Sequence, residues 1–149
     1  MGIEFHQQLF RHDPENGVYG DCFRTVIACL LKKKPEDVPH FCNGPDDGKT
    51  DERVEAYLRP QGYVLLCTLY EGDLDLDHLM QIGKQNSRGL HWLLTGRSRS
   101  GCNHVVICKD DQIIHDTSLN KSGIIGPASS GFFYIEWLVR LAPCDEASP

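Results

Sequence analysis

Residues 20 to 31 of this chain read Gly20-Asp21-Cys22-Phe23-Arg24-Thr25-Val26-Ile27-Ala28-Cys29-Leu30-Leu31. Large apolar side chains recur in this stretch at intervals of three and four residues, at Phe23, Val26, Ile27, Leu30 and Leu31. Such spacing is typical of a helix that is buried on one side. Asp21 belongs to the residue types that favour a helix N-cap, so we expect the helix to begin at Cys22.

A cysteine at the start of a helix lies beside unpaired backbone N–H groups and the positive end of the helix dipole. Both favour the thiolate over the thiol, and the thiolate is the nucleophilic form of cysteine. The sequence therefore predicts that Cys22 is a nucleophile. A nucleophilic cysteine also needs a base, a group that orients the base, and donors for the oxyanion that forms during acyl transfer.

Composition limits the classes of protein to consider. The 149 residues, 40% of them hydrophobic, are enough for one domain spanning residues 1–149. The net charge of −6 argues against nucleic acid or an anionic membrane as the main partner.

The seven cysteines form no Cys-x-x-Cys pair, and polar residues interrupt the first dozen positions, unlike a signal peptide. We expect a cytoplasmic protein with free thiols and no membrane span.

The remaining elements follow from periodicity and turn residues. The cysteine helix should end near Lys34 because Pro35 cannot continue it. Further helices are expected at 51–59 and 74–82, and strands at 63–70, 91–95, 103–108, 112–115 and 132–141, although the last segment is also long enough for a helix. Helices first and mostly antiparallel strands later predict an α+β fold in which the cysteine helix packs on the sheet. Residues 143–149 are expected to be a flexible tail.

Two residues in the expected hairpin suit the roles of base and orienting group. His104 lies at the start of one strand and Asp116 at the end of its partner. A three-residue loop at 109–111 would place His104 opposite Asp116, whereas a two-residue loop would place it opposite Thr117. We therefore expect the longer loop, with Asp116 favouring the imidazolium form of His104.

Asn16 is the candidate for a second oxyanion donor. It lies six residues before Cys22, in a polar segment that leads into the helix, and its side-chain amide could act together with the Cys22 N–H. The alternative is that Asn16-Gly17 is a plain turn.

These motifs resemble the papain-like cysteine peptidase superfamily, and within it the small peptidases that process bacteriocin leader peptides. The resemblance lies in an Asp-Cys helix start at 21–22, the strand Asn103-His104-Val105-Val106-Ile107, and Asp116 after the next strand; the family carries glutamine where this chain has Asn16. The resemblance implies a fold with two halves. A helical half carries the cysteine, and it packs against an antiparallel β-sheet half that carries the histidine and the aspartate. The resemblance also implies Cys22 as nucleophile, His104 as base and acid, Asp116 as orienting residue and position 16 in the oxyanion hole. We expect a hydrolase that acts on amide or isopeptide bonds of a peptide or protein, or an enzyme that transfers acyl groups from amides or thioesters, with no cofactor or metal.

Other interpretations remain open. A zinc site could draw on the Cys and His residues between Cys102 and Asp116, but the usual ligand spacing is missing. A catalytically silent module of the same fold could act by binding a partner protein, with the acidic segment 46–52 as its contact surface. Three cysteines away from the expected site are interpreted as buried core residues, namely Cys29, Cys67 and Cys108.

Overall fold

Helices and strands alternate irregularly in the computed structural model, which describes residues 2–142. The helices are α1 (Cys22–Leu31), α2 (Thr50–Leu58) and α3 (Leu76–Ser87), and the strands are β1 (Tyr63–Glu71), β2 (Trp92–Arg97), β3 (Asn103–Lys109), β4 (Gln112–Asp116) and β5 (Phe132–Arg140). Short 3-10 turns are present at η1 (Pro14–Asn16), η2 (Pro35–Asp37) and η3 (Arg59–Gln61). The strands form one sheet in the order β1-β5-β2-β3-β4, and each neighbouring pair is antiparallel. The predicted α+β class is confirmed.

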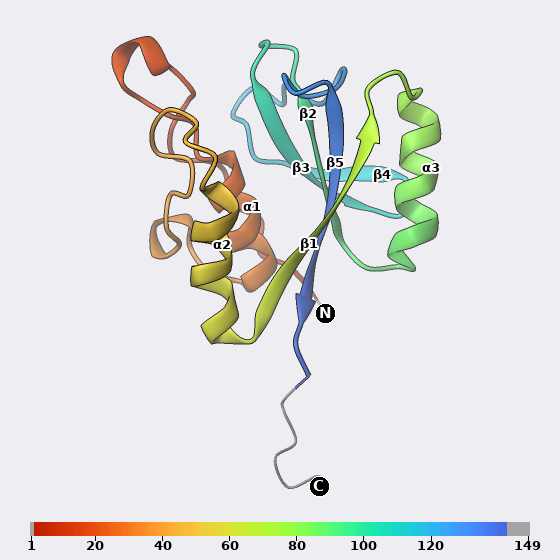
Figure 1. Ribbon diagram of the computed structural model, residues 1–149, viewed down its shortest axis with the longest axis horizontal. Helices are drawn as coiled ribbons and strands as arrows, with labels where there is room; N and C mark the ends of the chain where they lie inside the picture. The colour runs from red at the N-terminus through yellow and green to blue at the C-terminus, as the bar shows by residue number, and fades with distance from the viewer. Residues whose placement is uncertain (1, 143–149) are drawn as a thin grey trace, which may run out of the picture.

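The sheet separates two layers of helix (Figure 1). Helices α1 and α2 lie on one face, and α3 lies on the other. Successive side chains of a strand point to opposite faces, so neighbours in sequence belong to different cores. Leu93 of β2 packs with α1, for example, whereas Leu94 packs on the side of α3.

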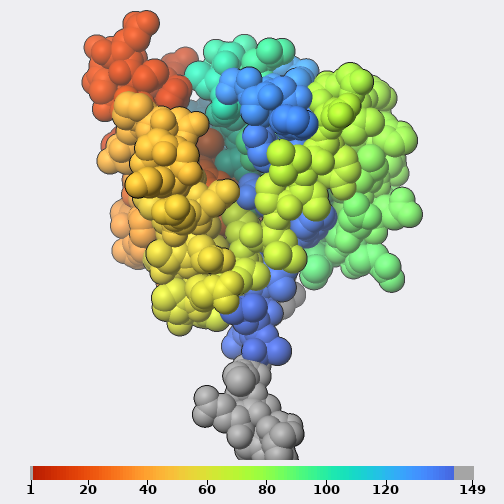
Figure 2. Space-filling view, viewed as in Figure 1, coloured from red at the N-terminus to blue at the C-terminus, as the bar shows by residue number. Residues whose placement is uncertain are grey.

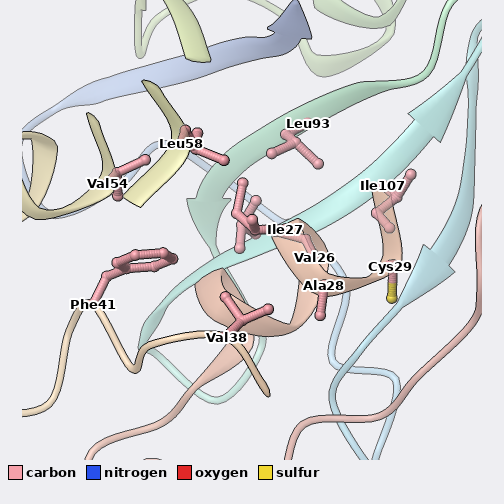
Figure 3. Packing of buried hydrophobic residues seen from close by; sticks show 11 residues of the cluster. Val26, Ile27, Ala28, Cys29, Val38, Phe41, Val54, Leu58, Leu93 and Ile107 are labelled. Atoms are coloured by element: carbon pink, nitrogen blue, oxygen red, sulfur yellow. The ribbon is translucent and has the colours of Figure 1, made fainter. Parts of the chain in front are cut away.

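Helix α1 is buried more completely than a helix with one apolar stripe would be. Val26 and Ile27 pack against Leu93 and Ile107 of the sheet, as predicted (Figure 3). Thr25, Ala28 and Cys29 are also fully buried. The reason is that the irregular segment after the helix folds back over it and contributes Val38 and Phe41 to the same core (Figure 3). Each large apolar side chain buried there adds about 1.5–3 kcal/mol to stability.

The second core depends on a close approach between α3 and the sheet. Trp92 is fully buried against α3 at Gly83. A Cβ atom at position 83 would lie 2.3 Å from ring atoms of Trp92, so only glycine allows the helix to approach the indole so closely. The indole Nε1–H donates to Asp110 O at 3.0 Å, which leaves its polar group satisfied.

Element boundaries differ from expectation at two helices. Helix α1 ends at Leu31 because Lys32 adopts a left-handed φ of 58° and the Lys33 N–H donates to Ala28 O at 2.9 Å, a terminating arrangement that needs no proline. Helix α3 continues to Ser87, beyond the predicted end at 82.

Two other expectations concern single positions or segments. Cys67 is exposed on β1 rather than buried, while Cys29 and Cys108 are buried as predicted. The tail expected at 143–149 lies outside the described residues. Within residues 2–142, no helix combines the length and the apolar character needed to cross a membrane.

Candidate active site

Cys22 is the first residue of α1, as predicted, but Asp21 does not cap the helix with its side chain. The Asp21 carboxylate instead accepts hydrogen bonds from the backbone N–H groups of Leu9 and Phe10, at 3.2 and 2.9 Å, and from Arg24 Nε at 2.9 Å. Asp21 is only 1% exposed. It therefore ties the N-terminal segment to the start of α1 and leaves the first turn of the helix without a side-chain cap.

The β3–β4 hairpin is built differently from expectation. Asp110 and Asp111 form a two-residue turn, so the three-residue loop that the sequence analysis predicted is wrong. Within β4, Ile114 is an extra residue with no partner on β3. This β-bulge shifts the pairing by one residue between the turn and the end of the strand.

The bulge brings His104 and Asp116 together by another route. Asp116 pairs with Val106 in the register, and His104 lies two residues from Val106 on the same face of β3. His104 and Asp116 are therefore diagonal neighbours rather than direct partners, a separation that two polar side chains can span. His104 Nε2 lies 2.6 Å from Asp116 Oδ1. Because a carboxylate only accepts, Nε2 carries the proton and Nδ1 is the nitrogen left for Cys22.

Asp116 and Cys22 both raise the pKa of His104. Burial lowers the pKa of the imidazole, but hydrogen bonding to Asp116 and to Cys22, and the negative charges of both groups, raise it to about 9. His104 is only 6% exposed, so water screens these interactions weakly. The arrangement favours an imidazolium ion at neutral pH, placed between a carboxylate and the sulfur at the tip of α1.

The environment of Asp116 keeps its carboxylate ionised. Burial raises its pKa, but hydrogen bonds from His104 and from backbone and hydroxyl donors outweigh burial and hold the pKa well below its usual range. The Ser118 N–H and hydroxyl donate to Oδ1 at 3.0 and 2.8 Å, and the Gly123 N–H donates to Oδ2 at 2.8 Å. Asp116 thus fixes the imidazole and also folds the segment that follows β4.

The structure does not bring Asn16 to this group. Asn16 lies in η1, exposed, and its Nδ2 donates to Asp13 Oδ2 at 2.7 Å. It does not line the cavity beside Cys22. Spacing from the cysteine was a poor guide because η1 is held as a local turn, closed by the Gly17 N–H donating to Pro14 O.

A cavity of about 270 Å³ opens beside Cys22 and His104. One wall comes from the N-terminal segment, and the other comes from the β2–β3 loop and the segment after β4. Figure 2 shows the N-terminal residues, in red, standing next to the teal residues near position 100. The lining consists of Gln8, Arg11, His12, Gly20, Cys22, Ser98, Ser100, Cys102, Asn103, His104, Ser118, Leu119, Asn120 and Ser122.

Gln8 is one of the lining residues that the sequence analysis did not single out. Its backbone N–H donates to Thr117 O at 2.9 Å, next to Asp116, and its side-chain Nε2 donates to Phe10 O at 2.6 Å. Its Oε1 is buried without a partner among the described residues. Gln8 lies fourteen positions before Cys22, so only the docking of the N-terminal segment places it here. Its residue type was the available sequence signal, because the family that the chain resembles carries a glutamine at the position of Asn16.

The zinc alternative finds no support in the geometry of the hairpin. His115 lies on the opposite face of β4 from Asp116, and its Nε2 lies 2.7 Å from His6 O. Cys108 is buried in the core on the side of α3. Across residues 2–142, no three His, Cys, Asp or Glu side chains are grouped so as to hold a metal ion.

The raised pKa of His104 makes stability depend on pH. The unfolded imidazole titrates at 6.5 and the folded one at about 9, so its stabilising interactions are complete below pH 6.5 and are lost as pH rises through 9. We expect the difference in unfolding free energy between wild type and His104→Gln to shrink by up to about 3 kcal/mol over this range. Urea titrations of both proteins from pH 6 to 9.5 measure it. A difference that stays constant with pH would show that no such imidazolium forms.

Comparison of the chain with protein-family models, with curated proteins and with solved structures found no match.

Proposed function

We propose that this chain is a papain-like cysteine hydrolase that cleaves amide bonds of a peptide or protein substrate, or transfers acyl groups from amides or thioesters. The observation that carries the proposal is the alignment of three groups: a cysteine at a helix N-terminus, the imidazole of His104, and a carboxylate 2.6 Å from its far nitrogen. These are the nucleophile, base and orienting group that acyl transfer requires.

The reaction proceeds in two steps, acylation of Cys22 and then deacylation. The Cys22 sulfur attacks the substrate carbonyl carbon, a C–S bond forms, and the carbonyl electron pair moves onto oxygen. Collapse of this intermediate breaks the bond to the leaving amine or thiol, which takes a proton from the His104 imidazolium. Water or another nucleophile then gives its proton to His104 and attacks the thioester, and the thiolate leaves.

The oxyanion needs donors in the first turn of α1 and beside it. The Cys22 N–H lies in a helix start that no side chain caps. We infer that Gln8, rather than Asn16, supplies the second donor, because its amide lines the same cavity and Nε2 carries a second hydrogen beyond the one given to Phe10. Six cysteines of the described part of the chain are unpaired, which suits a reducing compartment such as the cytosol.

The test is a panel of acyl and peptide probes, each incubated with the protein and followed by intact-mass measurement and peptide mapping. We expect a covalent adduct confined to Cys22, absent from Cys22→Ala and retained by Cys102→Ala, which removes the other thiol of the cavity. Adducts spread over several cysteines, or equal labelling of Cys22→Ala, would contradict the proposal. That result would favour the alternative, a catalytically silent binding module.

A further inference from the structure

The cavity beside Cys22 contains an arginine without an ion-pair partner in the described part of the chain, although the protein is acidic. The whole chain carries a net charge of −6. The described residues that line the cavity nevertheless include no aspartate or glutamate, and they do include Arg11 and the imidazole of His104. A cation that no carboxylate neutralises raises the local concentration of anionic ligands in such a cavity.

The carboxylates closest to the cavity are paired with His104 and Arg24, so they do not neutralise Arg11. Asp116 lies behind His104, with its oxygens occupied by His104, Ser118 and Gly123. Asp21 is turned to the N-terminal segment and is paired with Arg24. Both are almost fully buried, so neither faces a ligand in the cavity.

Arg11 differs from the other arginines near α1 and α2. Arg24, Arg53 and Arg59 each form an ion pair with a carboxylate. The exposed Arg11 has no hydrogen-bond or ion-pair partner among the described residues, yet it lines the cavity together with Cys22. A guanidinium group with five free donors matches the geometry of a carboxylate or a phosphate.

We propose that the cavity selects substrates that carry a carboxylate or phosphate close to the carbonyl attacked by Cys22, and that Arg11 binds this anion. The inference rests on the proposed function for the identity of the reacting group. Cys22 also lines the cavity, so the uncapped first turn of α1 adds the positive end of a ten-residue helix to it. Arg11 is therefore a specificity residue rather than a participant in bond making.

Two alkylating reagents of the same size test the charge preference directly. Iodoacetate carries a carboxylate next to its reacting carbon, and iodoacetamide carries a neutral amide there. We expect the ratio of the iodoacetate rate to the iodoacetamide rate at Cys22 to fall about three- to tenfold in Arg11→Gln, as for the loss of one charge several ångströms away in a partly hydrated site. His104 remains in both proteins, so its own charge cancels.

The matched control is Arg88→Gln, which removes an exposed arginine after α3. Arg88 lies near the Trp92 end of β2, whereas the cavity lies at the other end, where Arg97 pairs with Asn103. We expect this variant to keep the wild-type ratio at Cys22. The exposed Cys67 serves as an internal reference, whose ratio should not change in either variant.

A second measurement does not depend on the thiol. In Cys22→Ser, the thermal midpoint is measured with phosphate, with succinate and with chloride at equal ionic strength, with and without Arg11→Gln. We expect an anion-dependent rise that Arg11→Gln removes. A rise with phosphate alone identifies a phosphate group as the ligand, and a rise with succinate alone identifies a carboxylate.

The outcomes separate this inference from the proposed function. If Cys22 reacts selectively but its reagent ratio is the same in Arg11→Gln, the inference is wrong and the proposed function stands. If Cys22 is unreactive while the anion effect depends on Arg11, the anion site stands and the proposed function fails. If neither readout depends on Arg11, the inference is wrong regardless of how Cys22 behaves.

Discussion

Replacing His104 by glutamine is expected to slow the alkylation of Cys22 by iodoacetamide at pH 6 by roughly 10²-fold, because an ordinary thiol with a pKa near 8.5 is almost entirely protonated at that pH. Turnover of any amide or thioester substrate should fall by roughly 10²- to 10⁴-fold, the usual contribution of a general base. Glutamine can still donate to Asp116 Oδ1, now 2.6 Å from the imidazole, so the buried carboxylate keeps a partner. Peptide mapping of the labelled protein measures the rate at each cysteine.

The control for this variant is His78→Gln, which replaces an exposed histidine on α3. Its alkylation rates should match those of wild type at every cysteine. If His104→Gln labelled Cys22 as fast as wild type at pH 6, the imidazole would not activate the sulfur, and the hydrolase proposal would fail.

The second large effect is expected for Asp21→Ala, which should lower the free energy of unfolding by about 3–5 kcal/mol. The substitution leaves Arg24 buried without its carboxylate, and it also removes the acceptor for the Leu9 and Phe10 N–H groups. An uncompensated buried charge dominates this loss, since Arg24 is only 9% exposed. Urea unfolding monitored by circular dichroism measures it.

A surface pair and a double variant make this test specific. Asp47 pairs with Arg53 at 2.8 Å but is exposed, so Asp47→Ala should change stability much less. Removing Arg24 as well, in Asp21→Ala/Arg24→Leu, should recover part of the loss because no buried charge is then left alone. Equal losses for Asp21→Ala and Asp47→Ala would show that the Asp21 carboxylate does not organise the start of α1.

Asp21 also shows the limit of a prediction made from residue type alone. Asp21 was predicted as a cap because its residue type favours that position, and it does precede the first helical residue. Its side chain serves the N-terminal segment instead, twelve and eleven positions back. A choice between a local and a distant acceptor site depends on which backbone packs nearby, and residue type does not encode that packing.

The β3–β4 hairpin was also predicted only in part from local sequence signals. Strand residues were placed correctly on both sides of the turn, because β-branched residues next to the turn residues Asp110 and Asp111 are a local signal. The turn length was wrong, and the bulge at Ile114 was not foreseen. The bulge is compatible with the predicted proximity of His104 and Asp116 only because side chains can meet diagonally across a pair of strands.

The sequence by itself determined the elements whose causes lie within a few residues: the buried helix that begins at Cys22, the two strands that carry His104 and Asp116, and the antiparallel α+β plan. Only the tertiary structure decided that a β-bulge brings His104 and Asp116 together, that Gln8 rather than Asn16 lines the cavity, and that Arg11 lies there without an ion-pair partner among residues 2–142. Spacing and residue type act through contacts between near neighbours. Contacts between residues that lie some eighty positions apart form only when whole helices and strands pack together. They are stabilised by the packing of the complete core, which no short stretch of sequence specifies.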